Sequence, residues 1–287
     1  MSVVVKRSIV KKLIARDYRE AYALRARHFE EAALMTGRDA ASTRFKIANL
    51  IEQLPLSQGT RVLDVGPGDG ALFRSIASEV ALCCGVDPSV HAVERLRDLF
   101  AQSDNVHFEV GTCESIPLSD CSFDVVVINS VLLMLPSPDA VRRTLRELAR
   151  VCRDDGLIFV GEVPFRSEGE LGPIENLRRV VGDYGLVGSA RIAYRTYVRP
   201  LLFEGVVLVE PLLRTLHFPA EEFGALCREA GLSCRCVPHR ELKRVSTTRN
   251  DYLLQELGRS HTQRTAAADG GRRPGPNETR TNRGGLS

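Results

Sequence analysis

The feature that most constrains this chain is a glycine-rich turn directly after an apolar run. The run Arg61–Val65 is typical of a short buried strand, and Gly66, Gly68 and Gly70 follow it at alternate positions. Helix-compatible spacing resumes at Ala71. Glycine is needed where a turn demands unusual backbone angles, or where a ligand approaches a main chain that carries no Cβ. The stretch therefore predicts an α/β fold with a small-molecule cradle after its first strand.

The spacing and the charges of this turn indicate which ligand it suits. A dinucleotide site uses G-x-G-x-x-G and holds a pyrophosphate on backbone N–H groups. Here the spacing is G-x-G-x-G, Asp64 and Asp69 flank the turn, and it contains no Lys or Arg. Two carboxylates repel a pyrophosphate, whereas they favour a ligand that carries an amino group and a sulfonium.

The segment Val62–Gly70 resembles motif I of the class I S-adenosylmethionine-dependent methyltransferases, and the resemblance extends from Pro55 to Glu256. It implies that the chain is an enzyme whose cofactor is S-adenosyl-L-methionine. It also implies an α/β fold, with a Rossmann-like seven-stranded mixed sheet flanked by helices. An N-terminal helical cap and an insertion, or lid, after the fifth strand complete the expected architecture.

A second acidic residue lies where a ribose would need it. Asp87 ends the apolar run Val80–Val86, 17 residues beyond Gly70, near the interval of about 20 residues expected across one βαβ unit. A carboxylate at the end of the second strand can accept hydrogen bonds from both ribose hydroxyls. The register of Asp87 therefore agrees with the nucleoside site that the glycine turn predicts.

Two further segments resemble family motifs. Gly111–Leu118 is similar to the loop that wraps the adenine in the ubiquinone/menaquinone-biosynthesis-like group of methyltransferases, but Thr112 stands where an Asp is usual. A hydroxyl accepts a weaker hydrogen bond than a carboxylate. Asn129 follows the fourth strand, where family members place residues near the methyl group. Its segment is not Asn-Pro-Pro-Tyr, which argues against DNA-adenine and glutamine substrates.

The resemblance implies one set of cofactor-binding residues and no metal site. The set is Asp64, Gly66, Gly68, Gly70, Asp87, Pro88, Thr112, Cys113, Glu114 and Asn129. Methyl transfer needs alignment of donor and acceptor, exclusion of water and, for some acceptors, a base. For a hydroxyl acceptor, the candidate catalytic base is His217, with Glu162 at the end of the fifth strand as the second candidate.

Composition separates a basic N-terminal arm over 1–16 and a disordered basic tail over 258–287 from the rest of the chain. Between them, the resemblance implies a helical cap over 17–55 and a methyltransferase domain over 56–257, with its insertion at 164–217. Periodicity predicts helices over 16–35, 40–54, 71–78, 89–100, 139–152 and 218–230. It predicts further strands over 80–86, 106–110, 123–128, 157–163, 232–237 and 247–255, with a turn at 154–156.

Charge and cysteine content indicate which partners and which cellular compartment to expect. The formal net charge is +3, and it comes from the tail, so we expect no nucleic-acid partner. No apolar run is long enough to span a membrane, although the arm permits weak surface association. The eight Cys show no C-x-x-C spacing, which favours thiols in a reducing, cytoplasmic compartment. The sequence carries no signal for an oligomeric state.

The leading hypothesis is therefore a methyltransferase for a small-molecule acceptor. The acceptor group is expected to be a hydroxyl of a sugar, a lipid-linked compound or a secondary metabolite, while a carbon acid or an amine stays open. One alternative is an RNA or protein methyltransferase recruited by the basic tail. The other is a non-catalytic S-adenosylmethionine-binding partner of another enzyme.

Overall fold

The structure is a computed structural model of the 287-residue chain. It describes residues 11–14, 20, 40–165, 181–182, 185–190, 194, 206–209, 216–241 and 244–257. The chain divides into two units, Met1–Glu256 and Leu257–Ser287. All described residues except Leu257 belong to the first unit.

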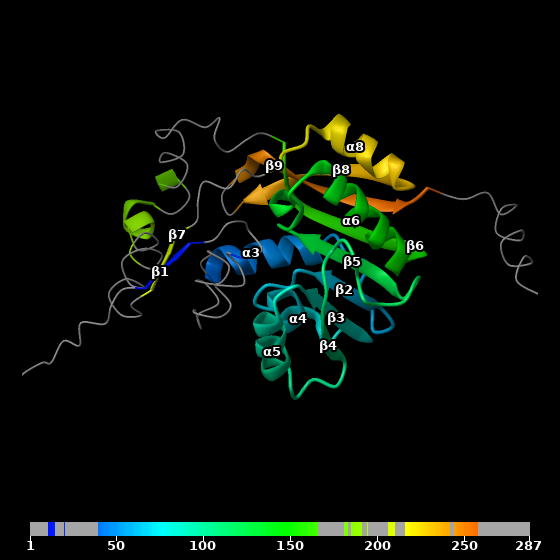
Figure 1. The fold of residues 1–287 in the computed structure, drawn as a ribbon, viewed down its shortest axis with the longest axis horizontal. Helices are drawn as coiled ribbons and strands as arrows, with labels where there is room; N and C mark the ends of the chain where they lie inside the picture. Colours follow the sequence, from blue (N-terminus) through cyan, green and yellow to red (C-terminus); the bar gives the residue numbers. More distant parts are fainter. Residues whose placement is uncertain are drawn as a thin grey trace, which may run out of the picture. The chain divides into compact units, whose positions relative to one another are not determined.

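A seven-stranded mixed sheet forms the centre of the first unit (Figure 1). Its strand order is β4-β3-β2-β5-β6-β9-β8, in which only β9 pairs antiparallel with its two neighbours. The strands are β2 (Arg61–Val65), β3 (Leu82–Asp87), β4 (Val106–Val110), β5 (Phe123–Asn129), β6 (Cys152–Pro164), β8 (Leu232–Glu241) and β9 (Arg244–Glu256). The seven-stranded mixed sheet predicted from the sequence is confirmed.

Helices cover both faces of this sheet. They are α3 (Ala40–Ile51), α4 (Ala71–Ile76), α5 (Val90–Leu99), α6 (Pro138–Val151) and α8 (Ala220–Glu229), with a 3-10 turn, η1 (Leu132–Met134). Alternate strand residues face opposite layers, since Val62 packs with the core under α3, α4 and α5, whereas Leu63 packs with the core under α6 and α8. Because hydrophobic residues occupy successive strand positions, the central strands are buried on both faces.

Local sequence signals explain several helix ends. Ser89 caps α5 by accepting a hydrogen bond from the backbone N–H of Ala92, and Ser137 caps α6 in the same way through Ala140. Gly231 follows α8 with φ of 78°, a left-handed conformation that glycine adopts without steric cost. The helix predicted over 40–54 begins at Ala40 as expected and ends at Ile51.

The predicted turn at 154–156 is wrong. These residues lie within β6, which begins at Cys152 opposite Phe123 and next pairs Leu157 with Val125. Four residues of β6 therefore stand opposite one residue of β5, so the Asp-Asp-Gly sequence produces a bulge within a strand and does not end one. The closing strands β8 and β9 are also longer than predicted, and they meet in a tight hairpin near Glu241.

A second, two-stranded sheet joins β1 (Lys11–Ile14) in parallel with β7 (Val206–Val209). One strand comes from the predicted arm and the other from the predicted insertion. The predicted helix 16–35, most of the insertion and the tail lie outside the described residues, so the predicted domain boundaries stay predictions. No helix within the described part of the chain is long and apolar enough to cross a membrane.

Candidate functional site

The glycine turn lies at the point where the strand order reverses, between β2 and its neighbours β3 and β5. Ligands of open α/β sheets bind at this switch point, beyond the carboxyl ends of the strands. Gly66, Gly68 and Gly70 have φ of 80°, 59° and 75°, so all three adopt the left-handed region predicted from the motif. The N–H of Gly66 donates to the carbonyl of Val86 at 2.8 Å, which ties the turn to the end of β3.

Asp64 is the most perturbed acid of the site. Its side chain lies at the end of β2 and is only 5% exposed. Burial, followed by the negative charges of Asp87 and Asp69, raises the pKa of Asp64 from 3.8 to about 7. Desolvation and like charges both disfavour the ionised form, so a cation bound nearby would stabilise the Asp64 carboxylate.

Asp87 ends β3 beside this acid. Its Oδ1 atom accepts a hydrogen bond from the backbone N–H of Ser89 at 2.8 Å, and the residue is half-buried. Burial raises the pKa of Asp87 to about 6, and the Ser89 hydrogen bond acts in the opposite direction. Pro88 follows as an exposed residue that leads into the Ser89 cap.

Asp69 has a different environment from the other two acids. Its carboxylate accepts the backbone N–H of Ala71 at 3.1 Å and forms an ion pair with Arg74 at 3.1 Å. The sequence interpretation treated Asp64 and Asp69 as equivalent carboxylates, but Arg74 compensates only the second. Asp64 and Asp87 are therefore the acids that present negative charge to a ligand.

The loop after β4 places its three candidate residues in different surroundings. Thr112 is half-buried and forms a small bridge with Ser115. Cys113 is buried, and its sulfur accepts a hydrogen bond from the Thr144 hydroxyl of α6 at 3.4 Å. Glu114 pairs with Arg143 of α6 at 2.6 Å. The side chains of Cys113 and Glu114 thus contact α6, and their predicted contacts with the cofactor stay predictions.

Strained backbone marks the carboxyl ends of β5 and β6. Ser130 and Glu162 have φ of 62° and 59°, which costs a residue with a Cβ roughly 1–2 kcal/mol. Asn129 precedes Ser130 and packs against Gly161, where a Cβ would lie 2.1 Å from its Oδ1 atom. Such strain is retained where the surroundings require one geometry, and it concentrates at functional sites. The predicted site residue Asn129 therefore lies in a constrained position at the same sheet edge as the glycine turn.

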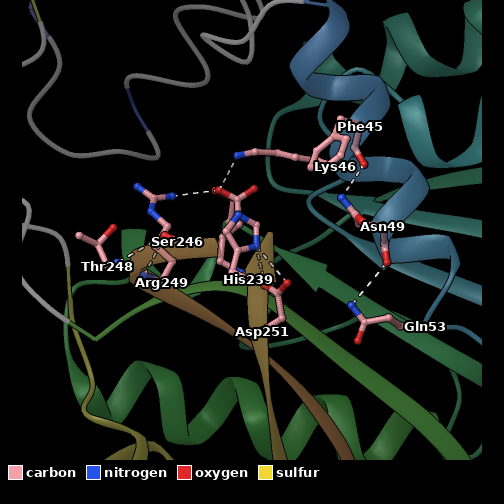
Figure 2. A network of polar contacts seen from close by, with 11 residues as sticks. Phe45, Lys46, Asn49, Gln53, His239, Ser246, Thr248, Arg249 and Asp251 are labelled. Carbon is pink, nitrogen blue, oxygen red and sulfur yellow. Dashed lines mark hydrogen bonds and ion pairs between the residues drawn. The ribbon is translucent and has the colours of Figure 1, made fainter. Parts of the chain in front are cut away.

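Lys46 and Arg249 point toward one carboxylate in a polar network that the sequence did not reveal (Figure 2), and this carboxylate is that of Glu162. Glu162 is 1% exposed, and its Oε2 atom lies 3.1 Å from Nζ of Lys46 and 3.0 Å from Nη1 of Arg249. The hydroxyl of Ser130 donates to the same oxygen at 3.4 Å. These partners come from α3, β9 and the end of β5, so sequence spacing contained no signal for their meeting.

His217 and Glu162, the two candidate bases predicted from the sequence, lie in different environments. His217 is exposed in the segment before α8, and the N–H of the next residue, Phe218, donates to the carbonyl of Pro164 at the end of β6. Glu162 is buried at the end of the same strand. A third group, the His239–Asp251 pair on β8 and β9, was missed, because neither residue belongs to a recognisable motif.

A substitution at Gly66 tests the conformation of the turn. An added Cβ would lie 2.6 Å from a methyl of Val131, in a backbone region that L-residues rarely adopt. Gly66→Ala is therefore expected to lower the free energy of unfolding by about 2 kcal/mol, measured by urea denaturation. Gly59→Ala is the matched control, because its Cβ would meet nothing within 4 Å; equal losses for the two variants would contradict the assigned geometry.

Comparison with known proteins assigns this geometry to a family. Residues 63–160 match the family model described as a methyltransferase domain. The uncharacterized methyltransferase YcgJ of Bacillus subtilis is 38% identical over 99 residues, which are 33% of this chain and 38% of YcgJ. The 27-O-demethylrifamycin SV methyltransferase of Amycolatopsis mediterranei is 34% identical over 43% of this chain and 46% of its own length. The chain thus spans less than half the length of either relative.

Solved structures support the same fold over a larger part of the chain. The YcgJ structure aligns with a TM-score of 0.51 at 17% identity, covering 75% of this chain and all of that one. A SAM-dependent methyltransferase from Aquifex aeolicus gives a TM-score of 0.51 at 17% identity, covering 79% and 98% of the two chains. The family match spans β2 to β6, the strands that carry the glycine turn, Asp87 and Asn129. Residues 63–160 therefore match a methyltransferase domain, and the chain shares its fold with a solved SAM-dependent methyltransferase.

Proposed function

We propose that this protein is an S-adenosylmethionine-dependent methyltransferase that acts on a small-molecule acceptor, with a hydroxyl as the group that receives the methyl. The observation that carries the proposal is the acidic glycine turn at the switch point of the sheet, within the segment matched by the methyltransferase family. The loop Gly111–Leu118 resembles that of the ubiquinone/menaquinone-biosynthesis-like group, and membership of that group is part of the proposal.

The residues of the turn fit the cofactor. A Cβ at Gly66 or Gly70 would collide with packed side chains, so the shape of the turn requires glycine at both positions. Asp64 and Asp87 are carboxyl groups with raised pKa values, so a ligand with positive charge relieves their repulsion. Asp87 would hold the ribose hydroxyls, and Asp64 would face the cationic methionine end. Thr112 is proposed for the adenine side.

When bound, S-adenosylmethionine supplies a methyl group on a sulfonium centre. The protein residues then have three tasks, namely to hold donor and acceptor in line, to exclude water, and to receive a proton where the acceptor carries one. Asn129, fixed against Gly161, is placed at the end of β5 to orient the reacting groups. His217 stays a sequence-based candidate for the proton acceptor.

The relatives' names favour a small acceptor. One relative is named for methylating 27-O-demethylrifamycin SV and another, from mouse, is a thiol S-methyltransferase with 32% identity over 48% of this chain. Neither name concerns RNA or protein, which supports the leading hypothesis over a macromolecular acceptor. We further propose a reducing, cytoplasmic location, in which the eight cysteines remain outside disulfide bonds.

Calorimetric titration with S-adenosylmethionine tests the proposed cofactor. We expect binding to the full chain, and Asp87→Ala should weaken it by roughly 10- to 100-fold, because a hydrogen bond to a charged group contributes about 1.5–3 kcal/mol. Asp98→Ala is the matched control, since Asp98 is exposed on the outer side of α5. Binding of NAD in place of S-adenosylmethionine would refute the proposal.

Activity distinguishes the alternatives that the sequence left open. Incubation of metabolite extracts with isotopically labelled donor, followed by mass spectrometry, should yield a labelled small molecule. A macromolecular methyltransferase recruited by the tail would instead lose activity on deletion of residues 258–287. A non-catalytic binding partner would bind the cofactor and label nothing.

A further inference from the structure

His239 and Asp251 form a buried pair across the β8–β9 hairpin (Figure 2). The Nδ1 atom of His239 lies 3.0 Å and 2.9 Å from the two carboxylate oxygens of Asp251. The Asp251 Oδ1 atom also accepts the backbone N–H of Glu162 at 2.8 Å. His239 is 5% exposed and Asp251 is 6% exposed. The histidine ring is therefore held in one orientation by a carboxylate that is itself anchored to β6.

This contact fixes the tautomer of the neutral ring. A carboxylate only accepts hydrogen bonds, so Nδ1 must carry the proton that Asp251 receives. Nε2 is then the unprotonated nitrogen of the neutral imidazole, and it has no hydrogen-bond partner among the described residues. A buried nitrogen without a partner carries a desolvation cost, which a ligand's hydrogen-bond donor would remove. The pair has the arrangement of a base oriented by a third group.

His239 is also one of the residues that line a small cavity. His239, Asp251, Glu162, Asn129 and Lys46 line it, together with Asn49, Leu50, Phe159 and Arg240. It has room for about one water molecule, which is also the size of a hydroxyl group. The cavity is therefore suited to hold the hydroxyl group of a larger acceptor, while the carbon skeleton of the acceptor lies outside the cavity.

The cavity adjoins the proposed methyl-transfer site. Asn129, at the end of β5, borders the cavity and belongs to the strand that pairs directly with β2 and its glycine turn. Among the described residues, the charged groups that line the cavity are Lys46, which pairs with Glu162, Asp251, which binds His239, and Arg240 of β8. The cations Lys46 and Arg240 would stabilise an oxygen from which a proton is being removed.

We propose that His239, oriented by Asp251, is the general base that removes the proton of a hydroxyl acceptor. This inference rests on the proposed function. The acceptor oxygen forms its bond to the methyl carbon with its own electron pair, while the carbon–sulfur bond breaks and leaves its pair on sulfur. The hydroxyl proton moves to Nε2, and the resulting imidazolium is balanced by the Asp251 carboxylate. The proton later leaves to solvent.

The tautomer is the first test, and it needs neither cofactor nor acceptor. The full chain is labelled with ¹⁵N-histidine, and the His239 signals are identified by their loss in His239→Gln. Long-range proton–nitrogen spectra should show a neutral ring protonated at Nδ1 and bare at Nε2. Asp251→Asn should change the tautomer while the remaining five histidines keep their signals. A proton on Nε2 of the neutral ring would overturn the proposal.

Methyl transfer is the second test, with phenol and thiophenol as probes of one shape. His239→Gln should slow phenol methylation by about 10²- to 10⁴-fold, the usual contribution of a general base. Thiophenol should lose less than about tenfold, because a thiol ionises more readily than a phenol. His107→Gln, exposed on β4, is the matched control and should retain the full rate. Loss of the acidic limb of the pH–rate profile in His239→Gln separates a base from a structural residue.

The outcomes discriminate this proposal from the proposed function. A wild-type rate of phenol methylation in His239→Gln would overturn the inference, as would loss of that rate in His217→Gln alone. If the wild type produces labelled thioanisole but no anisole, hydroxyl groups are excluded as its acceptors, and His239 is then excluded as the general base for them. Failure of the wild type to bind S-adenosylmethionine would instead refute the proposed function, while the tautomer measured without cofactor would be unaffected.

Discussion

Asp64→Asn is expected to stabilise the cofactor-free protein at pH 8 by up to about 4 kcal/mol and to leave its stability nearly unchanged at pH 4. Burial and two neighbouring acids raise the pKa of Asp64 from 3.8 to about 7. One pH unit between the folded and unfolded pKa corresponds to about 1.4 kcal/mol. Asparagine has the shape of the protonated acid and never ionises, so it removes the cost of the buried charge.

The sign of the pH dependence follows from proton binding. The folded state holds the Asp64 proton more tightly than the unfolded state, so this contribution to stability is complete below about pH 4. It is lost progressively as the pH rises through about 7. The difference between Asp64→Asn and the wild type should therefore grow between these two pH values and then remain constant.

Urea denaturation at pH 4, 6 and 8 measures this difference. Asp104→Asn is the control, because it replaces an exposed carboxylate in the same domain, and its effect should stay within about 0.5 kcal/mol at every pH. An Asp64→Asn variant that is less stable than the wild type at pH 8 would show that the carboxylate is compensated in the folded protein. The gain in stability should accompany weaker cofactor binding, since the uncompensated charge is what attracts a cation.

The sequence predicted the parts of the molecule that depend on local signals. The order of strands and helices from β2 to β6 follows from hydrophobic runs and turn residues, and Ser89 and Gly231 mark helix ends by their own chemistry. The glycine turn and Asp87 were identifiable because they lie within one βαβ unit, where spacing along the chain fixes spacing in space. This local coupling explains why the individual strands were located, whereas the mixed sheet that joins them was implied by the family resemblance.

The parts that were missed depend on distant pairing. Lys46 and Glu162 are separated by 116 positions, and Glu162 and Asp251 by 89. Their meeting depends on how β9 enters the sheet beside β6, which no local pattern encodes. The β6 bulge was missed for a related reason, because Asp-Asp-Gly is typical of a turn unless a neighbouring strand extends past it. Sequence reasoning therefore located the residues around the glycine turn more fully than the residues of the β8–β9 hairpin.

Glu162→Gln is expected to lower the free energy of unfolding by about 3 kcal/mol, because it removes the charge of one partner of a buried ion pair. The Glu162 carboxylate is buried between Lys46 and Arg249, and an amide keeps its shape but not its charge. Glu79→Gln is the control, since Glu79 is exposed, and denaturant unfolding at neutral pH gives both values.

A double-mutant cycle identifies the origin of this loss. Lys46→Met removes a cation that pairs with Glu162, so Glu162→Gln should cost less in that background, with a coupling energy of about 0.5–3 kcal/mol.

Glu162→Gln also distinguishes two roles for this residue. If Glu162 anchors the edge of the sheet, the variant loses stability but retains cofactor binding and the acidic limb of the pH–rate profile. If Glu162 is a general base, the second role that the sequence suggested, the variant retains stability and loses methyl transfer. Because the Oε2 atom of Glu162 accepts bonds from Lys46, Arg249 and Ser130, the first result is expected.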